Sequence, residues 1–362
     1  MVFSIVGADQ DPLYDWFAEG MQDVLQRRGH TYAEDPEDAG LVLNFFPEDR
    51  PRSFRRRAQA VFVVGIAAVH GEFQDPIRSG YPLLVRSLSN LMVVLLPGDG
   101  DGGNPEAHML TLEQGHYTVA GHHDGEAYFD HVYDRVAPLA TSRLVIDNIF
   151  EPDLEEELWD GDEITDSIYR AGRAMDELDL LPAPFPIQEI LSDRDFRHVK
   201  RLYGIGGLSY GNVSARKDRD RFWMSASGVD KSNLREIGRD ILMVTGYDQE
   251  KNAIRISVPP HVEPRRVSVD AIEHWMIYTS HPDVGAILHV HAWMEDVPST
   301  EMNYPCGTYE LGKAVAQLID ESPDPSRAVV GQRNHGLTIT GHSLDEIIER
   351  VGDRLMPQIP MS

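Results

Sequence analysis

The chain has little capacity for cross-linking, because its 362 residues include a single cysteine, Cys306. One cysteine excludes a disulfide within the chain and a zinc site built from several cysteines. Long apolar runs are also absent, and none approaches the roughly 20 residues that a membrane-spanning helix needs. The first residues, Met1–Val6, have a strand pattern with no basic flank or cleavage site. We therefore expect a protein of the reducing cytoplasm, with no secretory signal and no membrane partner.

Positive charge is scarce. The chain has 33 Lys+Arg against 59 Asp+Glu, which gives a formal net charge of −26 at pH 7. Such a surface repels phosphate backbones and anionic membranes, so nucleic acid is not an expected partner. Nucleotide-binding motifs are absent too, since the first strand is not followed by Gly-x-Gly-x-x-Gly and no loop ends in Gly-Lys-Ser/Thr. A small-molecule partner fits this composition better.

Residues 1–150 alternate apolar strand patterns with helix patterns. One helix is expected after the Asp11-Pro12 start, ending near Gly29, and another over Glu126–Val136. The strand patterns are short and almost continuously apolar, as in buried parallel strands. They are Val2–Val6, Leu41–Phe46, Ala60–Ala67 and Leu91–Leu96, with Arg143–Ile149 as a closing strand. The pattern predicts a doubly wound, Rossmann-like α/β domain whose role the sequence does not reveal.

A strongly acidic stretch, residues 151–163, follows this half and marks a predicted linker between domains 1–150 and 164–362. Beyond it, an apolar stripe predicts a helix, and a proline-rich break then interrupts the chain. The stripe consists of Ile164, Ile168, Ala171, Met175 and Leu178, and the break is Pro182–Pro186.

Three histidines form the most informative pattern of the second half. His289 and His291 are two residues apart in an apolar stretch that predicts a buried strand, so both project from one face. His335 lies in a Gly-flanked turn, Arg333–Leu337. Three histidines with an open fourth position suit a divalent metal that acts as a Lewis acid. The alternative is a histidine pair that is merely hydrogen-bonded in a core, and the spacing alone leaves both interpretations open.

Two turns and a serine ahead of a predicted helix form a candidate anion site. Gly211-Asn212 and Ser227-Gly228 present backbone N–H groups and a hydroxyl at turns, which suits an anion. Ser268 adds a hydroxyl near a positive helix end. Ordinary turns and helix caps are the alternative interpretation.

The motifs of residues 160–350, in their order along the chain, resemble those of the class II aldolase/adducin family. Five stretches in register carry the resemblance. They are Ser209–Arg216, Phe222–Lys231, Val267–Asp270 with the helix through His274 and Tyr278, Pro282–His291, and Arg333–Leu337. The resemblance implies a C-terminal class II aldolase-like α/β/α domain.

The resemblance also implies roles for the candidate residues. His289, His291 and His335 would bind a divalent metal, usually zinc, with Mn²⁺, Co²⁺ or Fe²⁺ as alternatives. The two turns and Ser268 would hold a substrate phosphate or carboxylate. This inference is weakened by Val269, which stands where the family normally has a second serine.

Asp270 stands where the aldolase branch of the family typically has a glutamate proton shuttle, and an aspartate here is typical of the pentulose-phosphate epimerase branch. It shares a helical face with His274 and Tyr278, and a helix N-cap is its alternative role. Between His291 and Gly307 the family usually has roughly twice as many residues, which help to form a subunit interface and donate a proton-transfer side chain. Tyr304 and Tyr309 are the local candidates for that acid.

The resemblance implies a metal-dependent lyase of carbohydrate metabolism that cleaves a small hydroxy-ketone or 2-keto acid, possibly phosphorylated, through a metal-stabilised enediolate. The alternatives are a sugar-phosphate 4-epimerase, a dehydratase and a non-catalytic adducin-like scaffold. In a further alternative, the N-terminal half is a regulatory binding module. A homo-oligomer is expected, a tetramer by resemblance, although the shortened 292–306 segment puts that arrangement in doubt. His289→Ala is expected to abolish metal binding with little loss of fold.

Overall fold

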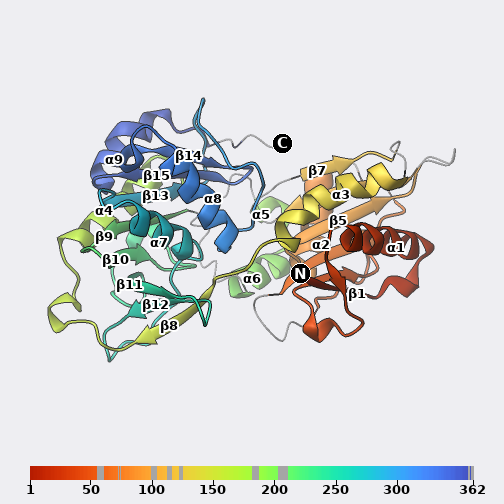
Figure 1. The fold of residues 1–362 in the computed structure, drawn as a ribbon, viewed down its shortest axis with the longest axis horizontal. Coiled ribbons are helices and arrows are strands. Elements are labelled where there is room, and N and C mark those ends of the chain that lie inside the picture. Colours follow the sequence, from red (N-terminus) through yellow and green to blue (C-terminus); the bar gives the residue numbers. More distant parts are fainter. Residues whose placement is uncertain are drawn as a thin grey trace. The chain divides into compact units, whose positions relative to one another are not determined.

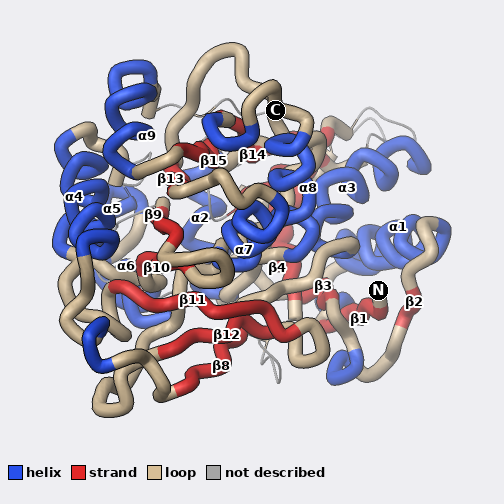
Figure 2. The backbone as a smooth tube through the Cα atoms, turned by 60° about the vertical axis from the view of Figure 1, so that its left-hand side comes forward, coloured by secondary structure: helices blue, strands red, loops and turns tan. Residues whose placement is uncertain are grey.

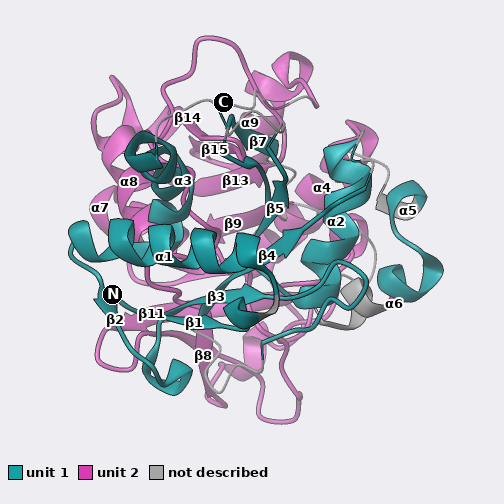
Figure 3. Ribbon diagram, turned by 90° about the vertical axis from the view of Figure 1, so that its right-hand side faces the viewer, with its two compact units in different colours: residues 1–141, 187–196, 361–362 teal, residues 142–186, 197–360 magenta. Residues whose placement is uncertain are grey.

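The computed structural model describes residues 1–54, 61–71, 73, 75–98, 104–111, 116–121, 125–181, 187–202, 211–357 and 359. The chain divides into two compact units (Figure 3). Residues 1–141 and 187–196 form the first unit, and residues 142–186 and 197–360 form the second. In the described part of the chain, no helix combines the length and the apolar character needed to cross a membrane.

The first unit is built on one mixed sheet, of which Figure 1 labels β1, β5 and β7. The described strands follow the order β2-β1-β3-β4-β5-β6-β7. The pairs from β2 to β5 are parallel, and β6 and β7 are antiparallel additions at the edge. The strands are β1 Val2–Val6, β2 Thr31–Tyr32, β3 Leu41–Phe45, β4 Phe62–Ala68, β5 Leu91–Leu96, β6 Glu106–Thr111 and β7 His116–Val119.

Helices pack against this sheet. They are α1 Pro12–Arg27, α2 Pro76–Ser87 and α3 Gly125–Ala140. The short α5 Ile187–Ile190 packs on α2, and α6 Asp193–Leu202 begins in the same unit. Asp11 caps α1 as predicted, because its carboxylate accepts a hydrogen bond of 2.8 Å from the Leu13 amide. The rings of Trp16 and Phe129 lie 4.9 Å apart where α1 meets α3. Helix α2 was not predicted, and Pro82 in its interior is a residue that normally breaks a helical pattern.

The predicted strands of this unit are present, but the Rossmann-like arrangement is not confirmed. Strands β3 and β4 are buried along their whole length, as their continuous apolar sequences indicate. The parallel strands of this sheet follow the order β2-β1-β3-β4-β5, whereas the strand order of the Rossmann fold is 3-2-1-4-5-6. What the structure shows is a mixed α/β unit.

The predicted closing strand lies elsewhere. Strand β8, Asp147–Glu151, pairs in parallel with β12, Ala253–Ser257, in the sheet of the second unit. The acidic stretch 151–163 also differs from a linker, because Leu154 and Leu158 are buried in the core of that unit while the glutamates between them are exposed. The second unit therefore begins near residue 142. The predicted break at Pro182–Pro186 lies outside the described residues.

The second unit contains a larger sheet, in which the described strands follow the order β14-β15-β13-β9-β10-β11-β12-β8 (Figure 2). All neighbours are antiparallel except β12 and β8. The remaining strands are β9 Asn212–Arg216, β10 Phe222–Ser225, β11 Ile241–Asp248, β13 Ala286–Val290, β14 Val329–Gln332 and β15 Gly336–Gly341.

Two pairs of helices cover this sheet. α7, Ala271–Ser280, packs on α8, Tyr309–Asp320, and α4, Glu163–Glu177, packs on α9, Leu344–Val351. Side chains alternate between the faces of β9, and Asn212 and Ser214 meet α7. Helix α4 contacts the same strand and buries the predicted residues Ile168, Ala171 and Met175. The sheet thus presents polar side chains to α7 at its centre.

Candidate metal centre and active site

The three predicted histidines converge. His289 lies on β13, His291 directly follows that strand, and His335 lies in the turn between β14 and β15. One ligand nitrogen from each ring lies within 4.8 Å of the others. The Nε2 atoms of His291 and His335 are 3.0 Å apart. This separation is close to that between two nitrogens bound to one metal ion, so the cluster could hold a divalent cation.

The turn that carries His335 has a local cause. Asn334 has a φ of 59°, in the left-handed region that asparagine tolerates. The next residue, Gly336, passes so close to β13 that a Cβ atom there would lie 2.2 Å from the Val290 carbonyl oxygen. The Asn-His-Gly sequence therefore lets the chain turn tightly and still places the imidazole beside β13.

The environment of the cluster favours metal binding. Burial lowers the pKa of His289, His291 and His335, so their rings are neutral at neutral pH. His289 Nδ1–H donates to the Leu337 carbonyl oxygen at 3.0 Å, which leaves a lone pair on Nε2. That Nε2 is buried and has no hydrogen-bond partner. A buried nitrogen in this state is the ligand atom that a metal ion would use.

Helix α7 meets the sheet through a row of polar contacts. Asp270 precedes the helix, and its Oδ2 accepts from Asn212 Nδ2 at 2.7 Å. Ser214 Oγ lies 2.7 Å from His274 Nδ1 and 2.9 Å from the Tyr278 hydroxyl. Asp270, His274 and Tyr278 therefore do share one helical face, and that face is turned toward β9.

Asp270 occupies the N-cap position of α7, but its side chain makes no capping hydrogen bond. Its Oδ1 instead accepts from the Gly307 amide at 3.3 Å, and its charge raises the pKa of His289 against the lowering by burial. The carboxylate thus binds the Asn212 side chain and the Gly307 amide, and it lies close enough to His289 to affect the pKa of that ring.

The proposed anion-binding turns lie around this carboxylate. Gly211 and Gly228 have positive φ angles of 75° and 68°. The Ser268 amide donates to the Ser225 carbonyl oxygen at 3.1 Å, and the Ser227 amide donates to the Arg266 carbonyl oxygen at 2.9 Å. The Asn212 side-chain amide donates to Asp270, and this bond does not use the backbone N–H groups that were predicted for an anion. Ser209 and Tyr210 of the same motif lie outside the described residues.

The two candidate tyrosines differ in their contacts. Burial, followed by the charges of Glu310 and Glu301, raises the pKa of the half-buried Tyr304. The guanidinium carbon of Arg143 lies 4.6 Å from the ring centre of Tyr309. Within the described part of the chain, no hydrogen bond or ring contact links either tyrosine to the three histidines, so the catalytic role of the tyrosines stays a prediction.

Sequence reasoning missed a buried lysine. Lys231 is 4% exposed, and burial lowers the pKa of its ammonium to about 8, opposed by attraction to Asp270 and Asp230. Its charge also lowers the pKa of His289 and His291. The ammonium is therefore close enough to influence the cluster. The signal was present, since Lys231 ends the Phe222–Lys231 stretch, three residues after Gly228, and is one of five lysines in the chain.

Glu273 was missed as well. Thr338 Oγ1 donates to its Oε1 at 2.6 Å, and Gln332 Nε2 donates to its Oε2 at 2.9 Å. Burial raises the pKa of this carboxyl well above the ordinary 4.5, and the charge of Asp270 raises it further. Glu273 lies on α7, three residues after Asp270, and faces Thr338 and Gln332 of the sheet. No sequence pattern marks it as buried.

The raised pKa of Glu273 makes a pH prediction. A carboxyl that binds its proton more tightly when folded stabilises the fold at acid pH, and this contribution is lost as pH rises through the folded-state pKa. Relative to the wild type, Glu273→Gln should therefore gain unfolding free energy above about pH 4.5, by up to about 1.4 kcal/mol per pH unit. Urea unfolding between pH 4 and 8 measures the difference. The exposed Glu349→Gln is the control, and parallel curves for Glu273→Gln and wild type would contradict the assignment.

Gly211 gives a second prediction. A Cβ atom at this position would lie 2.4 Å from the carbonyl oxygen of His289, in addition to the strain of its positive φ. Gly211→Ala should displace His289 and weaken metal binding. Gly29→Ala is a matched control, because Gly29 has a φ of 87° but nothing within 4 Å. It should cost about 1–2 kcal/mol and leave metal affinity unchanged. Equal metal affinities in the two variants, measured by calorimetry, would contradict the close approach.

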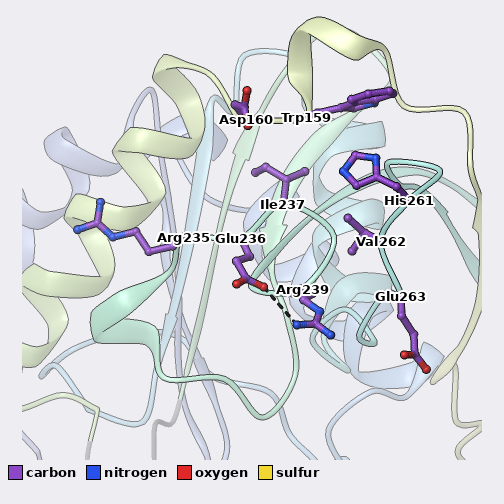
Figure 4. Close-up of a pocket in the computed structure, with 9 residues that line it drawn as sticks. All are labelled: Trp159, Asp160, Arg235, Glu236, Ile237, Arg239, His261, Val262 and Glu263. Atoms are coloured by element: carbon purple, nitrogen blue, oxygen red, sulfur yellow. Dashed lines mark hydrogen bonds and ion pairs between the residues drawn. The ribbon is translucent and has the colours of Figure 1, made fainter.

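A separate hollow of about 420 Å³ lies on the second unit (Figure 4). It is lined by Trp159, Asp160, Arg235, Glu236, Ile237, Arg239, His261, Val262 and Glu263. Arg239 pairs with Glu236 at 3.5 Å, and Arg235 stacks over Tyr169 at 3.6 Å. With three acidic residues against two occupied arginines, this hollow does not suit an anionic substrate.

Comparison with known proteins supports the same reading of the second unit. Residues 196–294 match the family model of the class II aldolase and adducin N-terminal domain. Methylthioribulose-1-phosphate dehydratase from Leptospira biflexa is 27% identical over 158 residues, which are 41% of this chain and 69% of that protein. The family match includes His289 and His291, and the structure adds His335 to them.

Solved structures with some likeness include an L-fuculose 1-phosphate aldolase, with 17% identity and a TM-score of 0.34 over 53% of this chain and 84% of that one. The N-terminal class II aldolase domain of a conserved protein from Thermoplasma acidophilum has 16% identity and a TM-score of 0.34, over 56% of this chain and 95% of that one. The likeness to the class II aldolase and adducin family therefore rests on the sequence match of residues 196–294.

Proposed function

We propose that the chain is a metal-dependent lyase that cleaves a carbon–carbon bond in a small hydroxy-ketone or 2-keto acid. One observation carries the proposal: three histidines converge with an unpartnered buried Nε2 on His289, and the Asp270 carboxylate lies close enough to raise the pKa of His289. A non-catalytic scaffold has no use for such a set. A divalent metal held there, for which we propose zinc, would polarise a carbonyl oxygen and stabilise the negative charge of an enediolate.

The residues of the chain divide the remaining work. Asn212 and the Gly307 amide orient Asp270, which exchanges a proton with the carbon or hydroxyl next to the substrate carbonyl. Lys231 places a buried positive charge close to that carboxylate. The turns at Gly211-Asn212 and Ser227-Gly228, with Ser268, bind a phosphate or carboxylate of the substrate through backbone amides and hydroxyls. Tyr304 or Tyr309 is the proposed second proton donor.

Dehydration is a second candidate, and a specific observation favours it. The curated relative from Leptospira biflexa, which aligns over 158 residues, is a methylthioribulose-1-phosphate dehydratase. Both reactions would pass through an enediolate. In cleavage the β-hydroxyl would lose its proton and the bond between the α- and β-carbons would break, whereas in dehydration the α-carbon would lose its proton and the β-hydroxide would leave. The same residues would serve both reactions. A 4-epimerase remains a third outcome of the test.

The test begins with metal analysis of the purified chain and continues with turnover of a panel of phosphorylated and free hydroxy-ketones and 2-keto acids. Proton NMR distinguishes an aldehyde product, a dehydrated ketone and an epimer. We expect one of these products, dependent on added metal and abolished by a chelator. Metal-free protein without turnover on any member of the panel would contradict the proposal and favour a scaffold.

We also propose that the chain forms a homo-oligomer, a tetramer by resemblance. The shortened segment 292–306 packs on its own unit, where Trp293 bridges to Met356 and Ser299 to Gly331. An interface must therefore use other surfaces than the longer segment of the family. Light scattering at micromolar concentration measures the mass, and a monomer would contradict this expectation.

A further inference from the structure

Cys306 lies against the metal centre. Its Sγ is 3.2 Å from His335 Nε2 and 3.9 Å from Nδ1, so it faces the Nε2 side of the ring. The same Nε2 lies 3.0 Å from His291 Nε2, which makes it the nitrogen turned into the cluster. The sulfur is outside the set of three atoms that lie within 4.8 Å of one another, but it borders that set at His335.

A second observation shows that this place is built for a ligand. His289 Nε2 is buried and unpartnered, and its lone pair is available because Nδ1–H is bound to the Leu337 carbonyl oxygen. A buried nitrogen without a partner costs free energy unless something binds it. Cys306 is therefore next to a histidine cluster in which one buried nitrogen, His289 Nε2, has no bonding partner.

The contact between Cys306 and His335 cannot persist once a metal binds. His335 Nε2 has one lone pair, which can accept from the thiol or bind a metal ion, but not both. The backbone around Cys306 is held in place, because the Gly307 amide donates to Asp270 and the Gly307 carbonyl oxygen accepts from the Val145 amide at 2.7 Å. The sulfur can thus move only by rotation about the Cα–Cβ bond.

Rotation about this bond carries the sulfur along a short arc beside the cluster. Zinc–nitrogen and zinc–sulfur bonds of about 2.1 and 2.3 Å place two ligands of one tetrahedral ion roughly 3.6 Å apart. The observed 3.2 Å between Sγ and His335 Nε2 is near that separation. The position of the sulfur beside one ligand is therefore compatible with a bond to the same ion.

We propose that Cys306 supplies a thiolate as a fourth protein ligand when a divalent metal occupies the cluster. This inference rests on the metal site of the proposed function. The thiol releases its proton to water, the sulfur lone pair forms the metal–sulfur bond, and one water molecule leaves the metal. A thiolate selects zinc or cobalt over manganese and magnesium, so the cysteine sets the metal preference. A substrate then binds as a fifth ligand or replaces the sulfur.

Cobalt substitution of the full chain tests the proposal without reference to activity. Cobalt bound by a thiolate has an intense sulfur-to-metal charge-transfer band in the near ultraviolet, and Cys306 is the single cysteine of the chain, so a thiolate band has one source. We expect the band in the wild type and its loss in Cys306→Ser. Zinc affinity, measured by chelator competition, should fall more than about 100-fold in that variant, because a ligand is lost, with manganese affinity nearly unchanged.

The outcomes separate the two proposals. Cobalt bound with 1:1 stoichiometry but without the band in the wild type, or a band that persists in Cys306→Ser, would overturn the role of Cys306 and leave the three-histidine site intact. A wild type that binds no cobalt at all would overturn both. The thermal midpoint of metal-free Cys306→Ser should match that of the wild type, which shows that the variant folds.

Discussion

Replacing His291 with alanine should abolish tight binding of a divalent metal and leave the fold intact. His291 is one of three converging ligands, and its Nε2 lies 3.0 Å from that of His335. Mutation of a residue that only orients a ligand lowers metal affinity about 10–100-fold. Loss of a ligand itself should therefore lower metal affinity more than about 100-fold. Inductively coupled plasma analysis and calorimetric titration with zinc measure the effect.

His291 is a better position for this test than His289. His289 is fully buried, and its Nδ1–H donates a hydrogen bond to the Leu337 carbonyl oxygen. His289→Ala would therefore leave a cavity and an unpaired carbonyl oxygen, and the unpaired oxygen alone costs about 1–3 kcal/mol of stability. The expectation of little loss of fold is therefore revised for His289. His291 is partly exposed and follows the strand.

His261→Ala is the matched control, because His261 is exposed and lies outside the cluster. It should keep the metal content of the wild type. Full zinc content in His291→Ala, with an unchanged stoichiometry, would contradict the three-histidine site.

The convergence of the three histidines could be predicted from the sequence, because the position of each depends on a short-range pattern. Alternation along a strand puts His289 and His291 on one side, and the Asn-His-Gly turn brings His335 to the same strand. Helical spacing likewise placed Asp270, His274 and Tyr278 together, and the row of contacts to Asn212 and Ser214 follows from it.

The residues that were missed depend on packing between distant segments. Lys231 is buried because Gly172 on α4 lets the backbone approach, where a Cβ atom would lie 1.9 Å from the Lys231 carbonyl oxygen. Glu273 is buried against Thr338, which lies 65 residues away in the sequence. A local sequence pattern does not show contacts between residues that lie so far apart in the sequence.

The same limit explains the boundary between the units. The strand pattern near Arg143–Ile149 was visible, but its partner β12 lies about a hundred residues further along the chain. An apolar strand pattern shows that a strand is buried and does not show in which sheet it lies. The acidic residues that followed were equally compatible with a linker and with the exposed side of a packed segment.

Asp270→Asn should separate metal binding from proton transfer. The amide keeps nearly the shape of the carboxylate, and its oxygen can still accept the 2.7 Å hydrogen bond from Asn212. The metal content should therefore equal that of the wild type. Proton transfer by a positioned side chain typically contributes 10²–10⁴-fold, so turnover should fall by about that factor.

The sharpest measurement for this variant is exchange of a carbon-bound proton in D₂O, followed by proton NMR on a small hydroxy-ketone phosphate and a 2-keto acid. Exchange reports removal of the proton next to the carbonyl, which is the first step of dehydration and the reverse of the protonation that completes cleavage. Asp283→Asn is the control, because Asp283 is exposed. This variant should catalyse exchange of the substrate proton at the wild-type rate. If Asp270→Asn kept its metal and exchanged protons as fast as the wild type, the proton would have to move through another group, and Tyr304, Tyr309 and Lys231 would be the next residues to replace.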